Sequence, residues 1–133
     1  MDRERLFEMI TAIRQEDLSR YISVQTNATL LDEPAMDFFT SQGVNLEVGI
    51  DGNEATTQRN RPGIGPYYYR DIVRGVNLVL NSKGLFTATM VVHPSSVGKM
   101  LENLKYLAAM GLKSVEAHPA FLEDWESDRK SVV

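Results

Sequence analysis

The stretch Tyr-Ile-Ser-Val-Gln-Thr-Asn-Ala-Thr-Leu-Leu, residues 21–31, decides how the rest of the chain is interpreted. Its first half is β-branched and has the length of a strand. Its second half is polar and leads into Asp32-Glu33-Pro34, which opens a helix. Parallel strands are buried on both faces, so polar groups collect at their carboxyl ends, where the βα loops meet solvent or ligand. The stretch therefore predicts a strand, a helix and, between them, either a ligand site or an ordinary solvated loop.

Length and composition limit the class of protein. At 133 residues with 43% hydrophobic and 24% charged residues, the chain has the composition of one globular domain. A net charge of −4 argues against nucleic-acid binding through phosphates. No apolar run has the length of a membrane span, and residues 1–5 lack a signal core, so we expect a cytoplasmic protein. The absence of cysteine excludes thiolate metal sites within this chain, and a content of 2 histidines argues against a protein-ligated metal site.

Apolar periodicity predicts an alternation of helices and strands over residues 1–119. Helices are expected at 2–17, 32–42, 67–82 and from a cap at Ser95 or Ser96 to Met110, with strands at 21–26, 44–50, 85–92 and 113–117. In the second strand, Leu46, Val48 and Ile50 alternate with Asn45, Glu47 and Gly49. A glycine there marks either a bulge or a close approach by a ligand or another backbone. The polar, glycine-rich segment 52–66 is predicted to form no regular element.

This alternation predicts an α/β domain with four parallel strands and four helices, followed by a loose tail at residues 120–133. Strands in sequential order would form an arc of a TIM-like barrel. A flavodoxin-like order would place a switch point in mid-sheet, and periodicity does not separate the two. Two cations in the long loop, Arg59 and Arg61, are candidates for clamping a carboxylate or phosphate.

Five segments in register resemble radical S-adenosylmethionine (radical SAM) enzymes, with the anaerobic sulfatase-maturating and peptide-modifying enzymes as the closest branch. Residues 25–31 resemble the family's Q-T-N-G-T-L-L, and residues 48–52 resemble V-S-I-D-G. Residues 58–67 are similar to D-R-N-R…G-K-G-S-F, residues 90–94 to T-V-V-N-P, and residues 111–119 to G-V-K-F-I-Q-F-I-P. The resemblance implies a partial (β/α)₆ barrel of which this chain covers the third to sixth strands.

The resemblance also implies roles for residues at the strand ends. Gln25, Thr26 and Asn27 would lie at the barrel mouth near cofactor or substrate. Arg61 would pair with the carboxylate of S-adenosylmethionine. Asp51 matches the family pattern, although a strand-end Asp that caps the following loop explains it equally well.

Other positions depart from the family pattern. His93 stands where the family has an Asn beside the ligand, and Gly49 replaces a Ser whose hydroxyl reaches the cofactor ribose. Val115 and His118, with Ala117 between them, would approach the adenine edge. Ala28 replaces a Gly, which is a mild change if the backbone there is ordinary.

The family's three-cysteine motif for the 4Fe-4S cluster and its Gly-Gly-Glu-Pro motif belong to the first two strands, upstream of the resemblance. Without those thiolates we expect this chain to be catalytically silent, as a fragment of a longer radical SAM enzyme. The alternative is a cluster-free binding or assembly module that keeps affinity for an adenosyl ligand; a flavodoxin-like regulatory domain is a third possibility. Unpaired strand edges and an apolar interior face would favour a dimer or contact with the remainder of a parent enzyme.

Overall fold

The computed structural model describes residues 2–61, 68–123 and 125. The elements, in chain order, are α1 (Arg3–Gln15), β1 (Ser23–Thr26), α2 (Glu33–Ser41), β2 (Asn45–Gly49), α3 (Glu54–Asn60), α4 (Tyr68–Leu80), β3 (Leu85–Val92), the 3₁₀ turn η1 (Val97–Lys99), α5 (Met100–Met110) and β4 (Val115–Pro119). None of the helices in these ranges is long and apolar enough to cross a membrane. The Gly63-Ile64-Gly65 segment, the predicted helix start at Tyr67 and most of the predicted tail lie outside the described residues.

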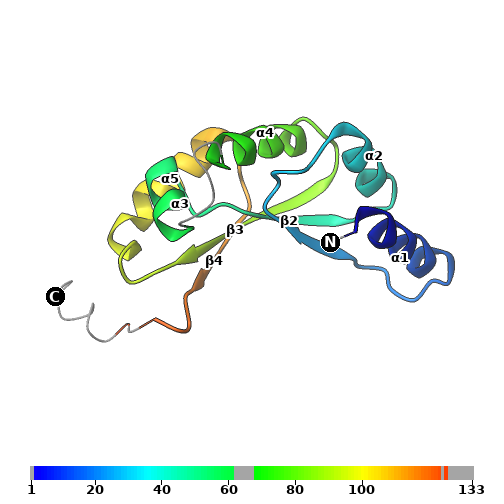
Figure 1. Cartoon of the computed structure of the whole chain (residues 1–133), viewed down its shortest axis with the longest axis horizontal. Helices are drawn as coiled ribbons and strands as arrows, with labels where there is room; N and C mark the ends of the chain where they lie inside the picture. The colour runs from blue at the N-terminus through cyan, green and yellow to red at the C-terminus, as the bar shows by residue number, and fades with distance from the viewer. Residues whose placement is uncertain (1, 62–67, 124, 126–133) are drawn as a thin grey trace.

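The four strands form one parallel sheet in the order β1-β2-β3-β4. This sequential order is that of a barrel arc and not the flavodoxin-like alternative. Figure 1 shows α2 to α5 along the convex side of the curved sheet, with α1 beside β1 at one end. The opposite, concave side carries no helix in the described part of the chain. The predicted α/β partial barrel is therefore confirmed.

The hydrophobic core lies between the sheet and the helices. On β2, Leu46 and Val48 are each 1% exposed, and they point toward buried residues of α2 and α4 such as Phe39 and Ile72. A buried side chain of this kind stabilises the fold by about 1.5–3 kcal/mol relative to its exposed state. The side chains packed between the sheet and the helices are therefore the main source of folding stability. Because Leu46 and Val48 face the helices, the β2 residues between them face the concave side of the sheet.

The concave face is polar on β1 and β2, whereas β3 adds the apolar side chains of Leu85 and Val91, so the expected apolar interior is present only in part. Strand pairing brings Gln25 opposite Glu47, and Gly49 opposite Thr89, on this face. The Ser23 hydroxyl and the Gln25 amide donate to the two carboxylate oxygens of Glu47, at 3.0 and 2.9 Å. Because inward positions carry hydroxyl, amide and carboxylate groups, water or a polar ligand can cover this face without loss of hydrogen bonds.

Two helices begin at an aspartate cap. The Asp2 side chain accepts from the Glu4 N–H at 3.1 Å, and the Asp32 side chain accepts from the Ala35 N–H at 2.9 Å. At α5 the prediction is wrong in detail, because Ser96 makes no side-chain cap and the turn η1 precedes the helix. Instead, the Ser96 hydroxyl accepts from the His93 N–H at 3.1 Å and closes the β3–η1 connection.

A fifth α-helix, α3, occupies the segment predicted to have no regular element. It begins at an Asn53 cap, whose side chain accepts from the Thr56 N–H at 3.0 Å, and it buries Thr56 and Thr57. Its residues give no apolar periodicity, so the pattern that identifies the other helices is absent here. Polar tertiary contacts, and not an apolar stripe, keep this helix in place.

The main contact is a buried hydrogen-bond network around Gly52 and Asn103. The Asn103 amide oxygen accepts from the Asn53 N–H at 3.1 Å, and its nitrogen donates to the Thr56 hydroxyl at 3.0 Å. The Tyr69 hydroxyl donates to the Gly52 carbonyl at 3.1 Å. Burial, and then the neighbouring Tyr106 hydroxyl, raise the pKa of Tyr69 well above its ordinary value, so it keeps its proton for this bond. The network joins α3, α4 and α5 to the end of β2.

The fourth strand is Val115–Pro119, two residues later than the predicted 113–117. His118 pairs with Val91 of β3 and so belongs to the strand itself. Four of the five β4 residues are exposed, because β4 is an edge strand with no helix after it in the described ranges. This register brings His118 onto the concave face.

Candidate functional site

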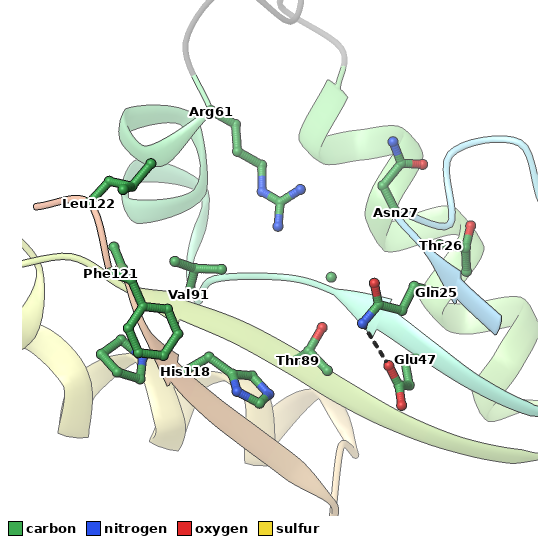
Figure 2. Close-up of a pocket in the computed structure, with 13 residues that line it drawn as sticks. Gln25, Thr26, Asn27, Glu47, Arg61, Thr89, Val91, His118, Phe121 and Leu122 are labelled. Carbon is green, nitrogen blue, oxygen red and sulfur yellow. Dashed lines mark hydrogen bonds between the residues drawn. The ribbon is translucent and has the colours of Figure 1, made fainter. Parts of the chain in front are cut away.

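A cavity of about 730 Å³ lies on the concave face at the carboxyl ends of the strands. All four strands contribute to it, together with the end of α3 and the segment after β4 (Figure 2). Its lining residues are Gln25, Thr26, Asn27, Glu47, Gly49, Arg61, Thr89, Val91, His118, Pro119, Ala120, Phe121 and Leu122. Parallel α/β folds place ligands at this end of the sheet, so the cavity is the candidate functional site.

The end of β1 supplies three of the predicted residues in a tight polar turn. The Asn27 amide oxygen accepts from both the N–H and the hydroxyl of Thr29, at 3.1 and 2.8 Å. The Thr26 hydroxyl accepts from the Ala28 N–H at 3.1 Å. Because its oxygen is used within the turn, Asn27 presents its amide nitrogen as the group available to a ligand.

Ala28 has a left-handed backbone, with φ of +69°, so the condition under which an alanine there would be a mild change is not met. This conformation favours glycine and costs an alanine about 1–2 kcal/mol. Helix α4 holds the turn from behind, because Arg74 donates to the carbonyls of Thr29 and Leu31 at 2.7 and 2.9 Å. Gly75 packs directly on the Ala28 backbone.

Asp51 organises the upper rim of the cavity without lining it. It is 1% exposed, and its two oxygens accept from the Val91 N–H at 2.9 Å, the Asn60 amide at 3.3 Å and the Arg61 Nε at 3.2 Å. The carboxylate therefore ties the ends of β2, β3 and α3 together. These contacts go to β3 and to the end of α3, whereas the start of the following segment is capped by Asn53.

Arg61 projects from the end of α3 into the cavity (Figure 2). Burial alone would lower the pKa of its guanidinium, but the hydrogen bond and charge of Asp51 outweigh burial and raise that pKa above its ordinary value. A guanidinium oriented through Nε can present its remaining N–H groups to a carboxylate or phosphate. Arg59, the other predicted clamp residue, lines a separate small recess with Ser96 and Lys99.

Gly49 leaves room for this guanidinium. A Cβ at position 49 would lie 3.0 Å from the Arg61 Nη2, and strand pairing continues from Gly49 to Thr89 without a bulge. The group that comes close to this glycine is therefore an arginine side chain, and not another backbone or the bulge named among the sequence-based alternatives. The end of that side chain can move by a few tenths of an ångström, so a serine at 49 is sterically feasible.

Of the two histidines, one lies in the cavity. His118 lines it, with its Nε2 at 3.5 Å from a Glu116 carboxylate oxygen. His93 does not line it, and its Nδ1 lies 3.3 Å from a Glu123 oxygen. Val115 is partly buried and packs against the hydrophobic core, away from the cavity.

Sequence reasoning missed several lining residues. Glu47 and Thr89 stand in the middle of strands, so a search of strand ends and loops does not reach them. Phe121, at 87% exposed, belongs to the segment predicted as a loose tail. The signal that could have found Glu47 is the alternation in β2 of apolar residues with Asn45, Glu47 and Gly49, which marks a strand face without an apolar cover.

The donor set of this chain does not fit an iron–sulfur cluster. The sequence has no cysteine, and in the described ranges no three His, Asp or Glu residues are grouped so that they could hold a metal ion. An adenosyl amino acid fits better, because the cavity combines a fixed guanidinium with amide, hydroxyl and apolar surfaces.

Comparisons with known proteins identify relatives that share this fold. No known family profile matches the sequence. The serine-type anaerobic sulfatase-maturating enzyme of Klebsiella pneumoniae is 26% identical over 102 residues, which are 76% of this chain and 26% of that protein. Hexahistidine-tagged anSMEcpe with bound AdoMet superposes with a TM-score of 0.78 at 20% identity, over 89% of this chain and 32% of that one. Native anSMEcpe with bound AdoMet and Kp18Cys peptide gives 0.75 at 21% identity, over 86% and 33%.

The chain thus spans about a quarter of the curated relative and a third of the solved structures that it matches. The curated relative and the shared fold confirm the resemblance that the five sequence segments indicate.

Proposed function

We propose that this chain, a homologue of one segment of a radical SAM sulfatase-maturating enzyme, provides the part of such a barrel that faces S-adenosylmethionine. In the complete enzyme, reductive cleavage of that cofactor and hydrogen abstraction from a peptide or small-molecule substrate would follow. The cluster that delivers the electron would be held outside these 133 residues, because they contain no cysteine.

The observation that carries the proposal is the Asp51–Arg61 pair at the rim of the cavity. The 3.2 Å contact fixes the guanidinium in place, and the absence of a side chain at Gly49 gives it space. A carboxylate-bearing ligand would meet a cation whose orientation is already set, so little side-chain entropy is lost on binding. Gln25 and Asn27 would contact the ligand from β1, and His118 from β4, as the family resemblance implies for an adenosyl ligand.

A second candidate is a cluster-free module that binds an adenosyl ligand without catalysis. It is favoured by the same cavity in a sequence that has no cysteine. The gene sequence upstream of Met1 separates the two candidates. An open reading frame with three closely spaced cysteines supports the enzyme segment, whereas a start codon at Met1 supports the module.

Binding of S-adenosylmethionine to the 133-residue chain, measured by isothermal titration calorimetry, tests the shared part of both candidates. Replacement Arg61→Gln should weaken binding by about tenfold or more, because a charge-assisted hydrogen bond is lost. The matched control is Arg59→Gln on the same helix, which should leave affinity within about twofold.

A third variant separates ligand contact from folding. Arg61→Lys keeps a cation beside the buried Asp51 but removes the planar fork, so its affinity should fall while its unfolding midpoint stays close to that of the unmodified chain. No heat of binding for the unmodified chain, or equal affinities for the Arg61→Gln and Arg59→Gln variants, would contradict the proposal.

We also propose that this chain associates through its strand edges, with either the rest of a parent enzyme or a second copy. Both β1 and β4 are edge strands of the described sheet, and open edges offer unpaired backbone groups to another strand. The concave side also carries exposed apolar side chains, Phe121 and Leu122, that such a partner would cover. Sedimentation velocity should detect a dimer at protein concentrations on the order of tens of micromolar, and a stable monomer there would count against self-association.

A further inference from the structure

A carboxylate lies in the same cavity as Arg61 and is not used in the proposed contacts. Glu47 lines the cavity from β2, and its oxygens accept hydrogen bonds from Ser23 at 3.0 Å and Gln25 at 2.9 Å (Figure 2). Both donors are neutral, and among residues 2–61, 68–123 and 125 no cation forms an ion pair with it. Because its hydrogen-bond donors carry no charge, the negative charge of Glu47 is not neutralised and can attract a positively charged group of a ligand.

The two charges stand at different depths. Arg61 lies over Gly49, and Glu47 precedes Gly49 by two residues on the same strand and the same face. Two residues of a strand span about 6.6 Å. The cation and the anion of the cavity therefore stand at a spacing similar to the length of a small ligand. Such a pair selects a ligand that carries both charges, with the negative group at the rim and the positive group deeper.

We propose that Glu47 is a specificity-determining residue that selects a ligand with a positive charge, such as a sulfonium, deep in this cavity. The inference rests on the proposed binding of S-adenosylmethionine and extends it to the source of selectivity. S-adenosylmethionine carries a carboxylate and a sulfonium, whereas S-adenosylhomocysteine has the same carboxylate and ammonium but a neutral thioether. The pair of ligands therefore isolates the one charge that Glu47 would recognise.

The test is calorimetric titration of the 133-residue chain with each of the two ligands. The unmodified chain should prefer S-adenosylmethionine by about fivefold, the attraction expected between opposite unit charges about 4 Å apart with water present. Glu47→Gln should reduce the preference to about onefold, because it lowers affinity for S-adenosylmethionine more than affinity for S-adenosylhomocysteine. Glu102→Gln, an exposed carboxylate on α5 outside the cavity, is the control and should keep the preference.

A second measurement does not depend on the variant folding. In the unmodified chain, the ratio of the two affinities should fall as salt is raised. Screening weakens the contacts that both ligands share to the same extent, and it also weakens the attraction of Glu47 for the sulfonium, which S-adenosylhomocysteine lacks. Binding without preference, a preference that Glu47→Gln retains, or a ratio independent of salt would overturn the inference and leave the proposed function in place. Absence of binding by either ligand would instead refute the proposed function, and the inference with it.

Discussion

The contact between Gly75 and Ala28 allows a quantitative test of how α4 supports the candidate site. A Cβ added at Gly75 would lie 2.0 Å from the Ala28 carbonyl oxygen and 2.7 Å from the Ala28 Cβ. The partner atom is backbone, so the clash cannot be relieved by rotating a side chain. Helix α4 and the turn that carries Asn27 would have to separate to relieve it.

We expect Gly75→Ala to lower the free energy of unfolding by about 2 kcal/mol. Overpacking of a tightly packed site costs about 3 kcal/mol at the upper end of its usual range, and replacing a helical glycine by alanine returns about 1 kcal/mol. For a chain of this length the net loss corresponds to a fall in the unfolding midpoint of roughly 6–10 °C.

The control is Gly98→Ala. A Cβ at Gly98 would meet no atom within 4 Å, so this variant should be neutral or slightly more stable than the unmodified chain. Urea unfolding followed by circular dichroism measures both variants under the same conditions. If Gly75→Ala proves as stable as Gly98→Ala, the close approach of α4 to the Ala28 turn is refuted.

Two further predictions concern polar contacts outside the cavity. Asn103→Ala should lower the free energy of unfolding by about 2–3 kcal/mol, because the part-buried Asn53 N–H and the buried Thr56 hydroxyl lose their partner. The exposed Asn77→Ala should change it by less than about 0.5 kcal/mol in the same urea assay. The Arg3 guanidinium, and then a backbone N–H, hold the pKa of Asp32 below its ordinary value, so this contribution to stability is complete at neutral pH and is lost as pH falls through the lowered pKa. Arg3→Gln should raise the Asp32 pKa in an NMR titration, and an unchanged value would refute the assignment.

Much of the fold can be predicted from local sequence patterns. Apolar periodicity identifies four helices and four strands, and Asp32-Glu33-Pro34 indicates where α2 begins. The order of the strands does not follow, because periodicity records which residues are buried and not which strands are neighbours. Family resemblance supplies that order, and the sheet confirms it.

The rest depends on tertiary contacts. Helix α3 is stabilised by Asn103, which lies 50 residues after Asn53 in the chain, so no local pattern reveals it. At the other end of this helix, Asp51 accepts a hydrogen bond from Arg61, which lines the cavity, whereas Arg59 lies outside it. In β2, the alternation of apolar residues with Asn45, Glu47 and Gly49 does indicate a polar face. Because parallel sheets are usually buried on both faces, that pattern alone does not lead to the prediction that Glu47 lines a cavity.

The central claim is that the carboxyl ends of the strands on the concave face bind S-adenosylmethionine. Amide chemical shifts of the ¹⁵N-labelled chain, followed during titration with this ligand, test it residue by residue. We expect no change at Asn77 on the convex side, and changes at the residues that line the cavity: Gln25, Asn27, Gly49, Thr89 and His118. Changes confined to the helices, or no change at the strand ends, would contradict it.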